Sequence, residues 1–178
     1  MLTATYSIVT IKLEHKKARW TFSSIQQAIM NSIRNIKNAS GMDVENILER
    51  LSQFEHYCHQ RKMEVFVIPA VRRFTHEADS LIDELESLSA SSLAILHSLQ
   101  SKLRDAVRIG ALVIEDFCAS LEQCCAHLYH RLTREEELVH IAERVIPNEA
   151  WFGIAASFLS QDAARDKQFG TASFEEEE

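Results

Sequence analysis

Apolar residues recur at three- and four-residue steps along almost the whole chain, and little interrupts them. Only 4 Gly and 2 Pro occur among 178 residues, so there are few places for sharp turns. The chain shows no alternating runs typical of strands and no Asn-Gly or Asp-Gly dipeptide typical of hairpins. The spacing matches one face of an α-helix, whose period is 3.6 residues. The chain is therefore expected to be all-α, with long helices.

Turn signals divide the periodic pattern into four long helices. The first apolar stripe runs from Ile8 to Ile36 and stops at Asn-Ala-Ser-Gly, residues 38–41, where the glycine suits a left-handed helix cap. The third helix is expected to start at residues 75–80 and to end near Gly110, where the fourth begins. Four amphipathic helices joined by short turns predict an up-down-up-down bundle, in which each helix buries one stripe in a shared core.

The two prolines mark further breaks. Pro69 lies inside the second helical pattern, and its missing backbone N–H predicts a kink or a broken turn near residues 66–68. Pro147 starts a short fifth helix that runs through Phe158. Residues 1–162 are therefore assigned to the bundle. Residues 163–178, which end in four glutamates, are assigned to a flexible acidic tail.

Charge and cysteine usage exclude several classes of function. The formal charge of −7 disfavours nucleic acid as a partner, because phosphates need a basic face. No window approaches eighteen unbroken apolar residues, so no membrane span is expected. The four cysteines fall inside helical patterns, which favours reduced thiols in a cytoplasmic protein. No phosphate-binding glycine loop or nucleophile elbow occurs, so no hydrolase is expected and no catalytic residue is assigned. An oxidase-like or peroxide-handling enzyme, which needs an intact redox metal, is a weaker option than a role without catalysis.

Two histidine-led segments resemble each other, HQRKMEVFVIPAV from His59 and HRLTREEELVHIAERVI from His130. Each has a glutamate at the fifth position after the histidine, Glu64 and Glu135. A third histidine, His15, lies on the apolar stripe of the first helix. Because the second and fourth helices of a bundle are diagonal, these imidazoles are candidates for one interior metal site. The alternative for each is a core histidine bonded to a backbone carbonyl or to water.

The order of these pieces resembles the hemerythrin-like family, also called HHE cation-binding domains. The resemblance spans about residues 8–160 and rests on LEHKKA, CHQRKMEVFVIP, HEADSLIDELE, HRLTREEELVHIAERVI and EAWFGIAASF. It implies a four-helix bundle in which histidines and carboxylates hold two irons that are bridged by carboxylates and oxygen. The metal ligands implied for this chain are His15, His59, His130, Glu135 and Glu64.

The chain departs from the family pattern at three positions. The carboxylate expected one turn after His59 is replaced by Met63, and the one expected after His130 is replaced by Arg134. Ser89 stands where the family has its third-helix histidine. Methionine is a poor ligand for oxygen-bridged iron. A guanidinium at about 4 Å from a divalent cation costs several kcal/mol unless it is screened. These departures disfavour a standard two-iron centre.

The two fifth-position glutamates differ in their prospects as ligands. On an ideal helix a fifth-position residue lies about 140° from its histidine, whereas a fourth-position residue lies about 40° away. Glu64 could therefore share a metal with His59 only if the helix were distorted, for example by a π-bulge near Pro69. Glu135 has the better prospect, because it continues an apolar stripe of the fourth helix.

Three states of the interior stay open at this point. They are a two-iron centre, a single metal held by the three histidines with Glu135 or water, and a metal-free core. In the metal-free core Arg134 is expected to pair with a core-facing acid, Glu64 or Glu55.

The function that follows is a metal-binding or oxygen- and iron-linked sensing module with a weakened, non-standard site. The alternative is a metal-free regulatory or interaction domain that has lost the di-iron site. The cofactor is accordingly iron, as one ion or a degraded two-iron site, or none. The expected partners are a metal ion and dioxygen, and neither nucleic acid nor a membrane is expected. No protein partner is assigned.

Overall fold

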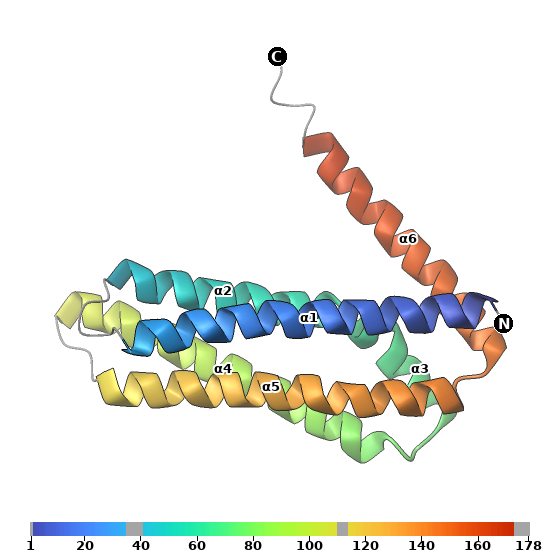
Figure 1. Cartoon of the computed structure of the whole chain (residues 1–178), viewed down its shortest axis with the longest axis horizontal. Helices are drawn as coiled ribbons and strands as arrows, with labels where there is room; N and C mark the ends of the chain where they lie inside the picture. Colours follow the sequence, from blue (N-terminus) through green and yellow to red (C-terminus); the bar gives the residue numbers. More distant parts are fainter. Residues whose placement is uncertain (1, 35–40, 110–113, 173–178) are drawn as a thin grey trace.

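The computed structural model describes residues 2–34, 41–109 and 114–172, and its regular elements are helices (Figure 1). They are α1 (Leu2–Arg34), α2 (Gly41–Gln60), the π-helical turn η1 (Met63–Val67), α3 (Ile68–Phe74), α4 (Asp79–Ile109), α5 (Ile114–Val145) and α6 (Asn148–Ala172). No strand occurs within these ranges, which confirms the all-α prediction. Nor does any helix within them have the length and apolar character needed to cross a membrane. Of the predicted turns and tail, residues 38–40, Gly110 and residues 173–178 lie outside the described ranges.

The four long helices α1, α2, α4 and α5 run side by side (Figure 1). Helix α1 packs against α2 and α5, and helix α4 packs against the same two helices. Helices α2 and α5 are therefore diagonal across the interior. Helices that are neighbours in sequence are thus neighbours in space, which is consistent with the predicted up-down-up-down arrangement.

Buried apolar side chains form two clusters along the bundle. One cluster joins η1, α3 and α6 to the adjoining parts of α1, α4 and α5, and it includes Ile11, Val71 and Trp151. The other lies among the four long helices and includes Phe22, Leu51 and Phe117. The separation is visible in single helices, since α1 contributes Ile11 to one cluster and residues from 18 onward to the other. The candidate site lies between the two clusters.

The break predicted around Pro69 is present, but it begins earlier than expected. Helix α2 already ends at Gln60, and the π-helical turn η1 fills residues 63–67. The N–H of Ile68 donates to the carbonyl of Met63, five residues back, as in a π-helix. Proline has no N–H and its ring displaces the carbonyl four residues back, so a regular α-helix cannot continue. Glu14 of α1 accepts the N–H of Lys62 at 2.8 Å, which satisfies one backbone donor at the break.

Helix α6 is longer than the short fifth helix that the sequence predicted. It starts after Pro147, as expected, but it spans 25 residues and therefore includes residues 163–172, which were assigned to the tail. Trp151, Ile154 and Phe158 are buried in the first apolar cluster. Farther along, α6 projects away from the bundle (Figure 1). The sequence of residues 163–172 has no apolar stripe, although its Ala, Gln, Lys and Arg residues favour a helix.

Candidate functional site

A layer of buried polar side chains crosses the bundle between the two apolar clusters. Its buried members are His15 of α1, Glu55 of α2, Arg61 between α2 and η1, Ser89 and Ser92 of α4, and Arg131 and Glu135 of α5. Both arginines are 1% exposed and Glu135 is 0% exposed. A charge this deep is costly unless it is paired and hydrogen-bonded, so the partners of these groups determine what the layer can do.

Two ion pairs cross the interior between the diagonal segments. Arg61, directly after α2, donates through Nη2 to both carboxylate oxygens of Glu135 on α5, each at 2.5 Å. Arg131 on α5 donates through Nη2 to Glu64 on η1. Each segment therefore supplies one arginine and one glutamate, and each arginine pairs with the glutamate of the other segment. The two glutamates are the fifth-position acids of the histidine-led repeat.

Arg131 links these pairs to a third carboxylate. Its Nη1 lies 3.5 Å from Oε1 of Glu55, and its Nε lies 3.4 Å from Oε1 of Glu135. With the hydrogen bond to Glu64, a single guanidinium thus contacts acids on α2, η1 and α5. The interior therefore contains a network of two cations and three carboxylates.

Both guanidinium groups stay charged in this network. Burial on its own would lower the pKa of Arg61, but the adjacent carboxylate of Glu135 more than offsets it, so the pKa of Arg61 is raised. Burial acts in the same direction on Arg131, and Glu135 and Glu64 together raise its pKa above the usual value. Two fixed positive charges therefore occupy the space between the diagonal helices at every physiological pH.

Glu55 is held from the opposite side by α4. The hydroxyls of Ser89 and Ser92 each donate to Oε1 of Glu55 at 3.2 Å. Nε2 of His59 lies 3.4 Å from the Ser89 hydroxyl and 3.6 Å from the same Glu55 oxygen. A nucleophilic serine needs its proton accepted by the histidine, with an acid at the other ring nitrogen. Here Glu55 accepts the Ser89 proton and approaches the same ring nitrogen, so this contact is not a hydrolase relay.

The structure places His15 in the interior, but its Nε2 is occupied. That nitrogen donates to the carbonyl oxygen of Leu132 at 2.8 Å, and it lies 3.8 Å from Oε2 of Glu135. A ring nitrogen that donates a proton to a carbonyl has no lone pair for a metal. His15 and Glu135, both predicted as ligands of one metal, thus lie close together. Their hydrogen-bond partners, however, are other groups of the protein, the Leu132 carbonyl and Arg61.

The other two candidate histidines lie at the margin of the bundle. The side chain of His59 is 48% exposed, at the edge of the layer beside Ser89 and Glu55. The side chain of His130 is 53% exposed, and its Nε2 lies 3.4 Å from Glu84 of α4. His15, His59 and His130 therefore have three separate sets of partners.

The substituted positions of the family pattern also differ in their surroundings. Met63 is buried in the first apolar cluster, and Ser89 lies in the polar layer. Arg134 donates to Glu84 at 2.9 Å and also pairs with Glu137. The expected pairing of Arg134 with Glu64 or Glu55 is therefore wrong, because Arg131, three residues earlier, makes both contacts.

The two interior arginines were missed in the sequence, although a signal for them exists. Arg61 follows the buried Cys58 by three residues, and Arg131 follows the buried Leu128 by three residues. Both therefore continue the three-and-four spacing of a core stripe, at positions where a regular bundle has an apolar residue. An arginine on such a stripe predicts a buried partner of opposite charge.

Three buried cysteines, Cys58, Cys124 and Cys125, lie near the layer. Their reactivity tests whether this part of the interior is closed to solvent. Burial raises the pKa of the Cys58 and Cys124 thiols to about 12 and that of Cys125 to about 11. Cys118 is only partly buried. Because the thiolate is the reactive form, iodoacetamide at about pH 8 should modify Cys118 first. Peptide mass spectrometry should find the other three modified only after unfolding, and rapid modification of Cys58 in the folded protein would contradict the buried layer.

Comparisons of the chain with protein-family models, with curated proteins and with solved structures find no match.

Proposed function

We propose that this chain is a metal-free helical-bundle interaction domain with up-down-up-down topology, whose interior ion pairs stand in the place of a metal centre. The single observation that carries the proposal is the pair of crossed contacts, Arg61 with Glu135 and Arg131 with Glu64. The resemblance to the hemerythrin-like family is part of the proposal. It implies that the layer corresponds to the position of that family's metal centre.

The chemistry of the layer argues against a divalent cation. The carboxylates that could bind one, Glu135 and Glu64, already accept hydrogen bonds from guanidinium groups. A metal at the same carboxylates would lie a few ångströms from two positive charges, at a cost of several kcal/mol. Among the residues that the structure describes, no group of three or more His, Cys, Asp or Glu side chains is arranged to hold a metal ion.

The exposed face of α1 supports a role in binding another protein. Tyr6, Val9, Leu13 and Trp20 are exposed, with Trp20 at 75%. Their spacing of three, four and seven residues places them on one side of the helix. Rows of large exposed apolar side chains commonly mark interaction surfaces.

Iron content and thermal stability test this proposal. The purified protein should contain iron well below one ion per chain, by elemental analysis. Its Tm should be the same with added Fe(II) as with EDTA, because a ligand that does not bind the folded state cannot stabilise it. A bound metal at a hundred times its Kd would add about 2.7 kcal/mol and raise the Tm. Near-stoichiometric iron with such a shift would instead favour the metal- or oxygen-linked sensing module.

A further inference from the structure

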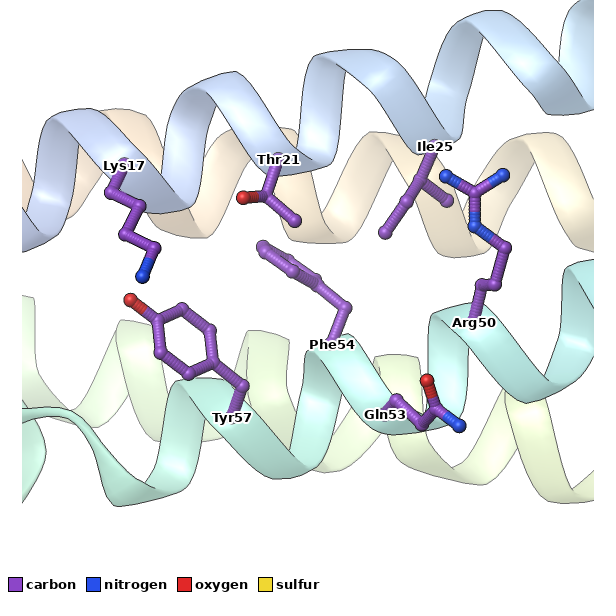
Figure 2. A pocket seen from close by; sticks show the side chains of 7 residues that line it. All are labelled: Lys17, Thr21, Ile25, Arg50, Gln53, Phe54 and Tyr57. Carbon is purple, nitrogen blue, oxygen red and sulfur yellow. The ribbon is translucent and has the colours of Figure 1, made fainter. Parts of the chain in front are cut away.

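We infer that the groove between α1 and α2 binds an acidic amphipathic helix of a partner protein. This inference rests on the proposed interaction function and assigns it a surface and a partner chemistry. The groove is a hollow of about 310 Å³, lined by Lys17, Thr21 and Ile25 of α1 and by Arg50, Gln53, Phe54 and Tyr57 of α2 (Figure 2).

The groove has an apolar centre with a cation at each end. Ile25 and Phe54 are buried and form the floor of the groove, and the partly exposed Thr21 and Tyr57 line it above them. Lys17 lies beside Tyr57 at one end and Arg50 lies near Ile25 at the other (Figure 2). Lys17 and Ile25 are eight residues apart on one helix, so the two ends of the groove lie about 12 Å apart along α1.

The charge of this groove contrasts with the rest of the protein. The chain has a formal charge of −7, yet no acidic residue lines the groove. Three other hollows of the described surface each include at least one glutamate. Several other cations of the bundle are paired, such as Arg19 with Glu136 and Arg72 with Asp83. Lys17 and Arg50 make no ion pair with any described residue, so both are available to a ligand.

The spacing of the two cations suits a helical occupant. Helices commonly bind in grooves between two helices by inserting an apolar stripe. In such a partner, two acids seven residues apart are separated by about 10.5 Å along the axis. Acids at this spacing, on either side of one or two apolar side chains, would face Lys17 and Arg50 while the apolar side chains contact the partly exposed Thr21 and Tyr57.

Binding of designed peptides tests this inference. The first probe is a labelled helical peptide of about 18 residues, roughly five turns, with a leucine stripe and two glutamates seven residues apart. The second probe has lysines in place of those two glutamates. Fluorescence anisotropy at low ionic strength should show that the wild-type protein prefers the acidic peptide. The double variant Lys17→Glu, Arg50→Glu should lose affinity for it by about tenfold or more, since two attractive contacts become repulsive.

A matched variant separates the groove from the net charge of the protein. Arg73→Glu with Lys102→Glu makes the same change in charge at exposed positions of α3 and α4, outside the groove. It should bind the acidic peptide as the wild type does. The groove variant should in turn gain affinity for the lysine peptide, which shows that it is folded. An equal loss in both double variants, or no preference between the peptides, would overturn the inference.

Two other occupants are outcomes of the same experiment. If dodecanedioate binds the groove and neither peptide does, the site takes a small dianion and the inference is wrong. If the protein self-associates and the groove variant does not, the groove belongs to a second copy and the inference is again wrong. If neither peptide binds and the protein contains no iron, the inference is wrong but the proposed function stands. The exposed face of α1 would then be its interaction surface. Iron in the protein would overturn the proposed function whatever the peptides do.

Discussion

Replacing Glu135 with glutamine is expected to lower the free energy of unfolding by about 3–5 kcal/mol, because it removes the counter-charge of a buried arginine. Arg61 donates to both oxygens of Glu135, and both side chains are essentially inaccessible to solvent. The neutral amide leaves that guanidinium buried without a charged partner. Urea unfolding followed by circular dichroism measures the change directly. The Tm should fall with it.

A control and a second variant isolate the ion pair. Glu137→Gln removes a carboxylate two residues away whose partner, Arg134, is also partly exposed, so the free energy of unfolding should change by less than about 0.5 kcal/mol. The double variant Arg61→Met, Glu135→Gln removes both members of the pair. It should recover much of the lost stability, since no guanidinium is left buried at position 61 without its counter-charge. Equal effects of Glu135→Gln and Glu137→Gln would show that the layer is not formed.

Trp151→Ala is expected to lower the free energy of unfolding by about 3–5 kcal/mol, as is usual when a buried tryptophan is truncated. Trp151 is 1% exposed and is part of the apolar cluster that joins α6 to the bundle. The carbonyl of the same residue accepts a hydrogen bond from Ser7 of α1. The smaller side chain leaves a cavity at the junction of α1 and α6. Thermal and urea unfolding measure the loss.

The neighbouring residue provides the control for this prediction. Phe152 is 64% exposed, so Phe152→Ala should change the free energy of unfolding by less than about 0.5 kcal/mol. The contrast between adjacent aromatic residues tests the orientation of α6 on the bundle. Similar effects at the two positions would mean that α6 does not pack as described.

The sequence predicted the position of some interior polar groups because they lie on apolar stripes. His15 and Glu135 continue the stripes of their helices, and both are buried. His130 was placed inward by its likeness to His59, but it is next to Arg131, and one residue along a helix rotates the side chain by about 100°. Arg131 therefore faces the interior while His130 contacts Glu84 near the surface.

The partners of the buried arginines could not be read from the sequence. Arg61 and Glu135 are 74 residues apart, and Arg131 and Glu64 are 67 residues apart. No local spacing rule connects positions so distant. The contact of Glu64 also depends on the irregular segment after Gln60, where a bend and a π-turn replace the regular helix. The sequence located a break near Pro69, but it did not give the side-chain directions on either side of it.

The amino-acid sequence by itself determined that this protein is helical and where its chain breaks, because helix periodicity and proline geometry act over a few residues. Only the tertiary structure decided which polar groups meet in the interior. It also decided how far α6 extends beyond the core. These outcomes depend on the rotation and packing of helices that are remote in sequence, and on the requirement that each buried charge find an opposite one.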